Sequence, residues 1–284
     1  MANTAFMTMF RDETVAAFER RESLLRQSCT NEAMVSGQTA TFLVAGTGGA
    51  TAVTRGVNGD IPANENALTQ IPVALTEWHA PFEMSGFNIF ASQGNQRKIM
   101  QDGAVAVINR KIDDMILTEL ATATVTAGAA TTASMPLVQK ALAILQIAGV
   151  PLDGQIMGVI SPSFLAYLMN VVGFTSSDFI DLKPLVGGNM PAWADKPRAF
   201  RWSNINWIVH NAVPGVGTAS ETCFMYHSSA IGHAMNSGGM MVELDRDARH
   251  DKSWVRSAAY MRAALLQNSG VVKILHDGSA HVGS

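Results

Sequence analysis

The sequence predicts a mixed α+β fold with one dominant helix and one extended arm. Within residues 93–120, apolar residues recur every three or four positions and therefore share one helical face. An apolar extended run, residues 76–92, is expected to lead into this helix without a break. Residues 37–80 are rich in Gly and Thr and have too little apolar bulk for a core of their own, so we expect a neighbouring copy of the chain to cover them. The apolar face of the helix comprises Met100, Ala104, Ile108, Ile112, Met115 or Ile116, and Leu120.

Composition indicates a chain that hides much of its surface between subunits. Of its 284 residues, 48% are apolar and only 15% are charged, whereas soluble domains carry roughly 25% charged residues. No stretch reaches the ~18 uninterrupted apolar residues that a membrane span needs. The first residues lack the basic start and apolar stretch of a signal peptide, so we expect a cytosolic chain without membrane contact. A net charge of −3 argues against general coating of nucleic acid.

Residues 1–36 are predicted to form a terminal arm with one modest helix over Arg11–Gln27. Four arginines in this helix are balanced by four acidic residues. The first interpretation is therefore that these charged residues form ion pairs at i,i+3 and i,i+4 on a solvated helix. The alternative is that the arginines make weak contacts with nucleic-acid phosphates.

Residues 37–80 are predicted to form a projecting hairpin. Thr39–Ala45 has strand character and ends at a glycine cluster, and Asn58-Gly59 is a strong signal for a tight turn. Pro72 restricts the returning strand to a sheet edge, because proline has no N–H to donate. Beyond the hairpin, a change of apolar parity at Ser85-Gly86 predicts a bulge. The returning strand alternates, with Ile71, Val73 and Leu75 on one side and Gln70, Ala74 and Thr76 on the other.

The rest of the chain is predicted to alternate helices and strands around a central lobe. After a small-residue linker, a helix begins at the Ser134 cap with Pro136 in its first turn, and it ends before Gly149 and Pro151. A buried strand over residues 155–160 leads into a second capped helix at Ser161-Pro162. Further strands are expected over residues 205–210, 222–227 and 240–244, then a closing pair, residues 254–266 and 271–275, joined by a turn at residues 267–270.

Candidate sites for chemistry are weak. A glycine cluster at residues 46–49 follows a strand, but no helix comes next, as a dinucleotide-binding loop would require. Cys223 and His227 lie four positions apart on a strand, about 13 Å, which is too far for a nucleophile and its base. We expect both to be buried strand residues. Cys29 and Cys223 also have no spacing partners for a disulfide or a zinc site.

An acidic cluster near the C-terminus is interrupted by basic residues. We expect a solvated or intersubunit charge patch there and not a metal site. Because no acid, base and nucleophile converge anywhere in the sequence, we expect no enzyme activity, no cofactor and no metal. The cluster consists of Asp245, Asp247 and Asp251, separated by Arg246, Arg249 and Lys252.

The order of these parts resembles the major capsid proteins of tailed bacteriophages, which have the HK97-like coat fold. The resemblance covers essentially the whole chain and is carried by four stretches. These are the hairpin GGATAVTRGVNGDIPAN, the long helix QGNQRKIMQDGAVAVINRKIDDMILTEL, the strand-to-helix segment GVISPSFLAYLMN, and the pair TCFMYHSSAIGHAM with SAAYMRAALLQNSGVVKIL.

The resemblance implies four regions. An N-terminal arm would span residues 1–36, and an extended hairpin loop would span residues 37–80. A peripheral domain, residues 81–125 and 243–284, would contain the long spine helix and the closing strands packed along it. An axial domain would span residues 126–242.

The resemblance also implies a structural role in a virion. Hexamers and pentamers would close into an icosahedral shell around double-stranded DNA, assembled in the host cytoplasm, with the hairpin loop over one neighbour and the arm under another. A separate scaffolding protein and a portal are implied as partners, with a decoration protein as a further one and only nonspecific contact with the packaged DNA. No lysine precedes Lys98, so the loop lacks the amine that covalently cross-linked family members use.

Nine residues are expected at contacts between subunits. They are Arg11, Arg21, Arg55, Asn58, Asp60, Glu65, Trp78, Asp245 and Arg246.

An encapsulin-type nanocompartment shares the fold and would enclose cargo enzymes, so it remains the alternative function. The contents of purified particles distinguish the two functions.

Overall fold

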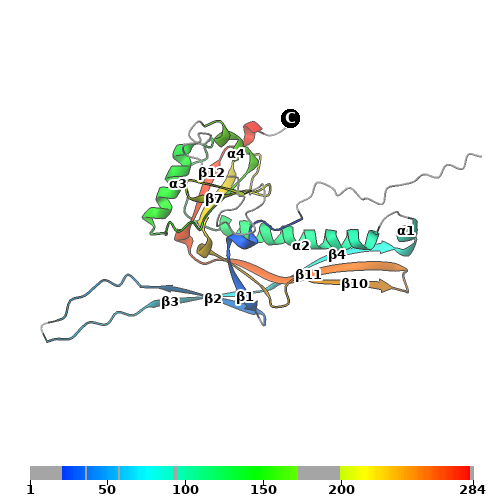
Figure 1. Cartoon of the computed structure of the whole chain (residues 1–284), viewed down its shortest axis with the longest axis horizontal. Helices are drawn as coiled ribbons and strands as arrows, with labels where there is room; N and C mark the ends of the chain where they lie inside the picture. The colour runs from blue at the N-terminus through cyan, green and yellow to red at the C-terminus, as the bar shows by residue number, and fades with distance from the viewer. Residues whose placement is uncertain (1–20, 36, 57, 92–94, 172–198, 282–284) are drawn as a thin grey trace, which may run out of the picture.

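The computed structural model describes residues 21–35, 37–56, 58–91, 95–171 and 199–281. The chain is elongated (Figure 1). A compact lobe lies above one end of the long helix α2 (Gln96–Ala121), and two β-hairpins below it extend toward opposite ends of the molecule.

The spine helix α2 confirms the apolar face predicted from periodicity. Every residue of that face is buried, and the helix packs along strands β4 and β11. The side chain of Asn95 caps its first turn by accepting a hydrogen bond from the backbone N–H of Lys98 at 3.2 Å. The buried face therefore fixes the helix against the sheet beneath it.

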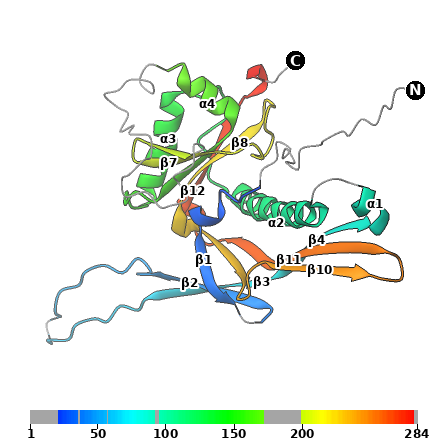
Figure 2. The same ribbon diagram turned by 45° about the vertical axis from the view of Figure 1, so that its right-hand side comes forward.

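The sheet under α2 is organised around one long strand, β11. The first half of β11 pairs antiparallel with both β10 and β4, and its second half pairs with β9, which in turn pairs parallel with β1. Figure 2 shows α2 lying across this sheet. The strands are β1 (Thr30–Val35), β4 (Thr76–Ser85), β9 (Ile231–Asn236), β10 (Met241–Asp247) and β11 (Lys252–Leu265).

The compact lobe contains a second sheet in the order β12-β8-β5-β7-β6. Strands β5 and β7 are parallel and the other pairs are antiparallel. Helix α3 packs against β12 and β8. The elements are β5 (Ile156–Ile160), β6 (Ala199–Trp202), β7 (Ile205–Val209), β8 (Glu221–His227), β12 (Val271–His276), α3 (Met135–Ile147) and α4 (Pro162–Met169).

The two helices of the lobe begin where the sequence predicted. Ser134 occupies the N-cap position of α3, with Pro136 in the first turn. Ser161 caps α4, its hydroxyl accepting a hydrogen bond from the backbone N–H of Phe164 at 3.0 Å. Short 3-10 turns complete the described chain at Arg26–Ser28, Ser228–Ala230, Asn268–Gly270 and Ser279–His281.

The projecting hairpin is also confirmed. Strand β2 (Thr39–Gly46) pairs antiparallel with β3 (Ala67–Ala74) in a two-stranded sheet, so Pro72 lies on an edge strand as predicted. The turn contains Gly59 in the left-handed region, φ +85°, and the N–H of Gly59 donates to the carbonyl of Gly56. The turn lies beyond the paired strands, because the described residues between Gly46 and Ala67 belong to no strand.

The predicted closing strand pair is wrong. β11 belongs to the sheet under α2, whereas β12 pairs with β8 in the lobe. The 3-10 turn Asn268–Gly270 carries the chain between the two sheets. The expected peripheral segment 243–284 therefore includes a strand of the lobe sheet, and the expected axial segment 126–242 includes β9, which pairs with β11.

The predicted bulge at Ser85-Gly86 is also wrong. β4 ends at Ser85 and a short helix, α1 (Gly86–Ala91), begins at Gly86, so the extended run does not continue into α2. The N–H of Gly86 donates to the carbonyl of Asp251 at 2.7 Å. A Cβ at position 86 would lie 2.5 Å from Asp251 Oδ1, so the glycine allows close packing of α1 on the turn between β10 and β11.

The terminal helix predicted over Arg11–Gln27 lies partly outside the described residues. Within them, residues 21–25 are not helical and only Arg26–Ser28 form a 3-10 turn. The backbone N–H groups of Leu24 and Leu25 bind a side chain of α2 and not a preceding carbonyl. A tertiary hydrogen bond thus replaces the helix.

Candidate subunit interface and the anchored arm

The loop hairpin, defined as β2, β3 and residues 47–66 between them, presents apolar side chains to solvent. Leu43 is 61% exposed and Leu68 is 62% exposed. The register pairs Leu43 with Gln70, two residues from Leu68, so the two leucines are diagonal neighbours on one face. The described residues of the subunit leave this face exposed.

The opposite face of the hairpin is fixed to the body. Phe42 is 4% exposed and packs over Gly232 of β9, where an added Cβ would lie 2.8 Å from the ring. Val73 and Ala234 join the same small apolar cluster. The base of the hairpin is therefore held in place while its outer face and tip remain free.

The four candidates in the connection between β2 and β3 are all exposed. Arg55, Asp60 and Glu65 form no ion pair within the described part of the chain. Asn58 lies at the turn beside Gly59. The charges of Arg55, Asp60 and Glu65 are therefore accessible to a partner.

Three of the remaining candidates, Trp78, Arg246 and Arg21, already have partners within the subunit. Trp78 is half-buried against the core, and Lys111 Nζ lies 4.0 Å from its ring centroid, a cation–π distance. Asp245 and Arg246 are exposed on β10, where Arg246 pairs with Asp251 at 2.9 Å. Arg11 lies outside the described residues, and the exposed Arg21 accepts a hydrogen bond at its carbonyl from Asn109 of α2.

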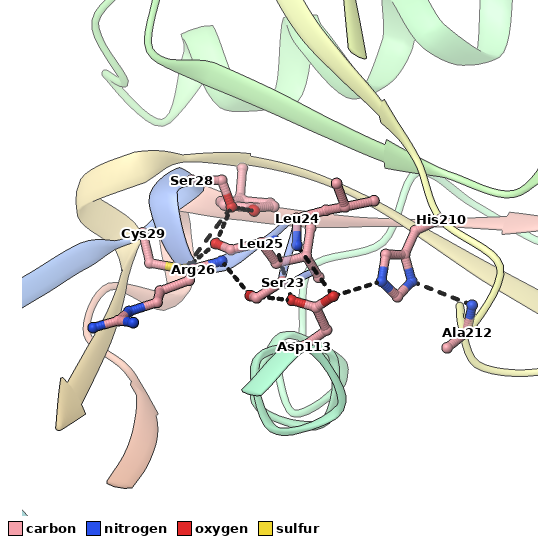
Figure 3. A network of polar contacts seen from close by, with 10 residues as sticks. Ser23, Leu24, Leu25, Arg26, Ser28, Cys29, Asp113, His210 and Ala212 are labelled. Carbon is pink, nitrogen blue, oxygen red and sulfur yellow. Dashed lines mark hydrogen bonds and ion pairs between the residues drawn. The ribbon is translucent and has the colours of Figure 1, made fainter. Parts of the chain in front are cut away.

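A buried carboxylate on the spine helix binds the end of the arm (Figure 3). Asp113 is 0% exposed and accepts hydrogen bonds from the hydroxyl of Ser23 at 2.6 Å and from the backbone N–H groups of Leu24 and Leu25 at 3.2 and 3.1 Å. Hydrogen bonds to a charged acceptor are stronger than those between neutral groups. The arm is thus fastened to the middle of the spine.

The same carboxylate binds the lobe through His210. The ring Nδ1 of His210 accepts a hydrogen bond from the backbone N–H of Ala212 at 3.2 Å, so Nε2 carries the hydrogen and donates it to Asp113 at 3.1 Å. Asp113 therefore connects three parts of the subunit: the arm, the spine helix, and the segment that follows β7.

Two further residues continue the anchor of the arm. Leu25 is fully buried in the main core. The hydroxyl of Ser28 is within 2.5 Å of the hydroxyl of Tyr226 on β8 and donates to the carbonyl of Leu25 at 2.7 Å. The anchored segment, residues 23–29, is consequently part of the folded subunit.

Sequence reasoning missed this anchor, although a signal was present. Asp113 lies in a second stripe on α2, with Ala106 seven residues before it and Leu117 and Leu120 four and seven residues after it, and all three are buried. A carboxylate flanked at helical spacing by apolar residues faces the interior and requires buried donors.

Cys223 is a buried strand residue, as the sequence predicted, and Cys29 is buried as well. Cys223 is fully buried on β8, and burial raises the pKa of its thiol well above the usual value. Burial likewise raises the pKa of Cys29 to about 12. Because the thiolate is the reactive form, burial lowers the reactivity of both thiols at neutral pH.

One buried histidine has an unpaired ring nitrogen. His233 on β9 is 1% exposed, and its Nε2 has no hydrogen-bond partner within the described residues. Burial and the nearby charge of Arg26 lower its pKa to about 4. The ring is therefore neutral at physiological pH.

Over the described residues, no group of His, Cys, Asp and Glu side chains is arranged to hold a metal ion. None of the described helices is long and apolar enough to cross a membrane.

A family model described as phage capsid protein matches residues 2–278, nearly the whole chain. The chain belongs to the phage capsid protein family. No curated protein matches this capsid protein by sequence.

Solved structures show that this capsid protein has the HK97-like coat fold. The capsid of Ralstonia phage GP4 has a TM-score of 0.74 at 10% identity, covering 99% of this chain and 98% of that one. A chain of Mycobacterium phage Che8 has a TM-score of 0.67 at 15% identity, covering 96% and 98%. The capsid of Cyanophage P-SCSP1u has a TM-score of 0.64 at 12% identity, covering 96% and 93%.

Proposed function

We propose that this chain is the major capsid protein of a tailed phage and self-assembles through hexamers and pentamers into an icosahedral shell around double-stranded DNA. The loop hairpin supports this proposal, because it projects from the body with apolar residues that the described part of the chain leaves exposed. Head-to-tail contacts between copies form closed rings when the rotation closes.

Several finer roles belong to the same proposal. The hairpin overlies a neighbouring subunit through Arg55, Asn58, Asp60 and Glu65, while Arg21 and the arm before it reach under another. Asp245 and Arg246 contribute contacts at the opposite end of the molecule. The shell is assembled in the host cytoplasm with a separate scaffolding protein and a portal, and a decoration protein is a further partner. The chain has no enzymatic role.

Shortening the hairpin tests the proposal. Replacing residues 48–66 by a short Gly-Ser turn leaves the ladder between β2 and β3 in place. The variant should unfold as cooperatively as the wild type, because Phe42 still packs on β9, but it should form no shells in electron micrographs. Wild-type particles from the shortened chain would contradict the proposal.

The contents of the particles separate this function from the encapsulin alternative, which the family match does not favour. Particles formed with the packaging proteins of the phage should contain double-stranded DNA. Particles that hold only a cargo enzyme would favour a nanocompartment.

A further inference from the structure

The tip of the loop hairpin contains the one Asn-Gly pair of the sequence, Asn58-Gly59. Both residues are exposed and belong to no strand, and they lie in the connection that Figure 1 shows projecting from the body. The side chain of Asn58 makes no hydrogen bond within the described residues. Its amide group can therefore turn toward the backbone nitrogen of the residue that follows.

The backbone nitrogen after Asn58 is accessible. Gly59 has no side chain to shield this nitrogen, and its φ of +85° is a conformation that glycine adopts readily. One hydrogen bond restrains it, from the N–H of Gly59 to the carbonyl of Gly56 at 2.9 Å. At an exposed turn such a bond is lost at little net cost, because water replaces the partner. The nitrogen of Gly59 can consequently reach Cγ of Asn58 when the turn opens.

We propose that Asn58 is a site of spontaneous covalent modification, at which the side-chain amide becomes a carboxylate without an enzyme. In the first step the backbone nitrogen of Gly59, after losing its proton to hydroxide, attacks Cγ of Asn58. A bond forms between these two atoms, and the bond from Cγ to Nδ2 breaks. Nδ2 takes up a proton from water and leaves as ammonia, so the product is a five-membered succinimide ring.

Water then opens the succinimide ring. Attack at Cγ gives aspartate, whereas attack at the backbone carbonyl carbon of residue 58 gives isoaspartate, in which the main chain runs through the former side chain. In sum, one water molecule is consumed and one ammonia is released for each asparagine. The conversion therefore needs no oxidant, reductant or bound cofactor.

A second asparagine in the same connection shows what Asn58 lacks. Asn64 is also exposed, but its Nδ2 donates to the carbonyl of Thr51 at 3.1 Å, and Glu65 follows it in the chain. The hydrogen bond restrains the amide of Asn64, and the side chain of Glu65 crowds the backbone nitrogen that would attack. The conversion is therefore selective for Asn58.

The conversion changes both the charge and the shape of the hairpin tip. A carboxylate at position 58 adds to the charges of Asp60 and Glu65, which already outnumber Arg55 in this connection. Isoaspartate also adds a carbon to the main chain inside the turn that the N–H of Gly56 closes by donating to the carbonyl of Asp60 at 2.9 Å. Under the proposed shell function, on which this last step rests, the free subunit therefore loses its competence to assemble as it ages.

Mass spectrometry of unassembled subunits tests the conversion. Purified subunits are aged in mildly alkaline buffer and digested, the peptide masses locate each converted asparagine, and a methyltransferase specific for isoaspartate labels that product. A synthetic peptide of residues 52–62, aged in parallel, is the reference. Asn58 should convert within a few fold of the peptide rate and at least tenfold faster than Asn64. An Asn58 that stays an amide while the peptide converts, or an Asn64 that converts equally fast, would overturn the proposal.

Asn58→Gln is the matched variant, because its longer side chain would have to close a less favourable six-membered ring. On ion exchange, aged wild-type subunits should show a more acidic species that the aged variant lacks. Ageing should remove most of the shell yield of the wild type, whereas Asn58→Gln should keep the yield that it has when fresh. Converted wild-type subunits that assemble as well as fresh ones would overturn the loss of competence.

Failure of the proposed function gives a different result. Fresh wild-type subunits that form no shells under any assembly condition would overturn the shell function, and the loss of competence with it. The conversion itself is measured on unassembled subunits, so the rates at Asn58 and Asn64 decide it in either case.

Discussion

Removing the carboxylate of Asp113 should loosen the junction between arm, spine and lobe. Asp113→Ala leaves the hydroxyl of Ser23, two backbone N–H groups and Nε2–H of His210 without this acceptor. The donors of Leu25 and His210 are buried, and those of Ser23 and Leu24 are partly buried. Each such buried donor keeps the cost of its lost hydration, about 1–3 kcal/mol, unless the structure opens to let water in.

The expected loss of subunit stability is about 3–5 kcal/mol, the range measured when one partner of a buried charged group is removed. That is a large part of the ~5–15 kcal/mol that stabilises a typical domain. Asp102→Ala is the matched control, because Asp102 lies exposed on the same helix. Its effect should stay within about 0.5 kcal/mol.

Two assays measure the effect on unassembled subunits. Urea unfolding gives the change in free energy, and limited trypsin digestion reports release of the arm through cleavage after Arg26. The Asp113→Ala subunit should be cut there much faster than the Asp102→Ala subunit. A loss below about 1 kcal/mol together with wild-type cleavage would refute the reasoning, because it would mean that the carboxylate does not hold the arm.

Three further predictions concern the core and the shell. Lowering the pH from 7 to 4 should destabilise the subunit by about 3 kcal/mol through His233. The reason is that the histidine takes up a proton near pH 6.5 in the unfolded chain but only near pH 4 in the folded subunit. In urea titrations, His233→Gln should remove this share of the pH dependence. Ile112→Asp should lower the free energy of unfolding by about 3–5 kcal/mol, since it buries an unpaired carboxylate. Cys223→Ser should leave assembly unchanged. Lost infectivity in a folded Cys223→Ser particle would reveal an active thiol. Mature particles boiled in detergent with reductant should run as one band near 30.3 kDa, because the loop has no lysine for an isopeptide bond. A ladder of larger bands that survives this treatment would contradict the prediction.

Local signals were enough for the elements whose structure depends on their own residues. The apolar repeat from Met100 to Leu120 predicted the buried face of α2, because a helix places residues three and four apart on one side. Ser134 and Pro136 predicted the start of α3, and Pro72 predicted an edge strand. Each of these features is determined by geometry within a few residues.

Long-range partners were beyond such signals. β11 and β12 are neighbours in sequence and each has strand character, but they pair in different sheets with β4, β9, β10 and β8. Strand pairing depends on which distant edges are free, and alternation along one strand does not specify them. The bulge predicted at Ser85-Gly86 failed for the same reason, since the contact that decides it comes from Asp251, far along the chain.

The sequence alone determined that the chain contains a buried spine helix and a projecting hairpin with little core of its own. Only the tertiary structure decided that Asp113 is a buried junction and that Phe87 and Phe90 form an exposed surface. An aspartate is usually solvated and a phenylalanine is usually buried. Both expectations reverse here because burial depends on what the rest of the fold places around a residue, and that arrangement is set by contacts distant in sequence.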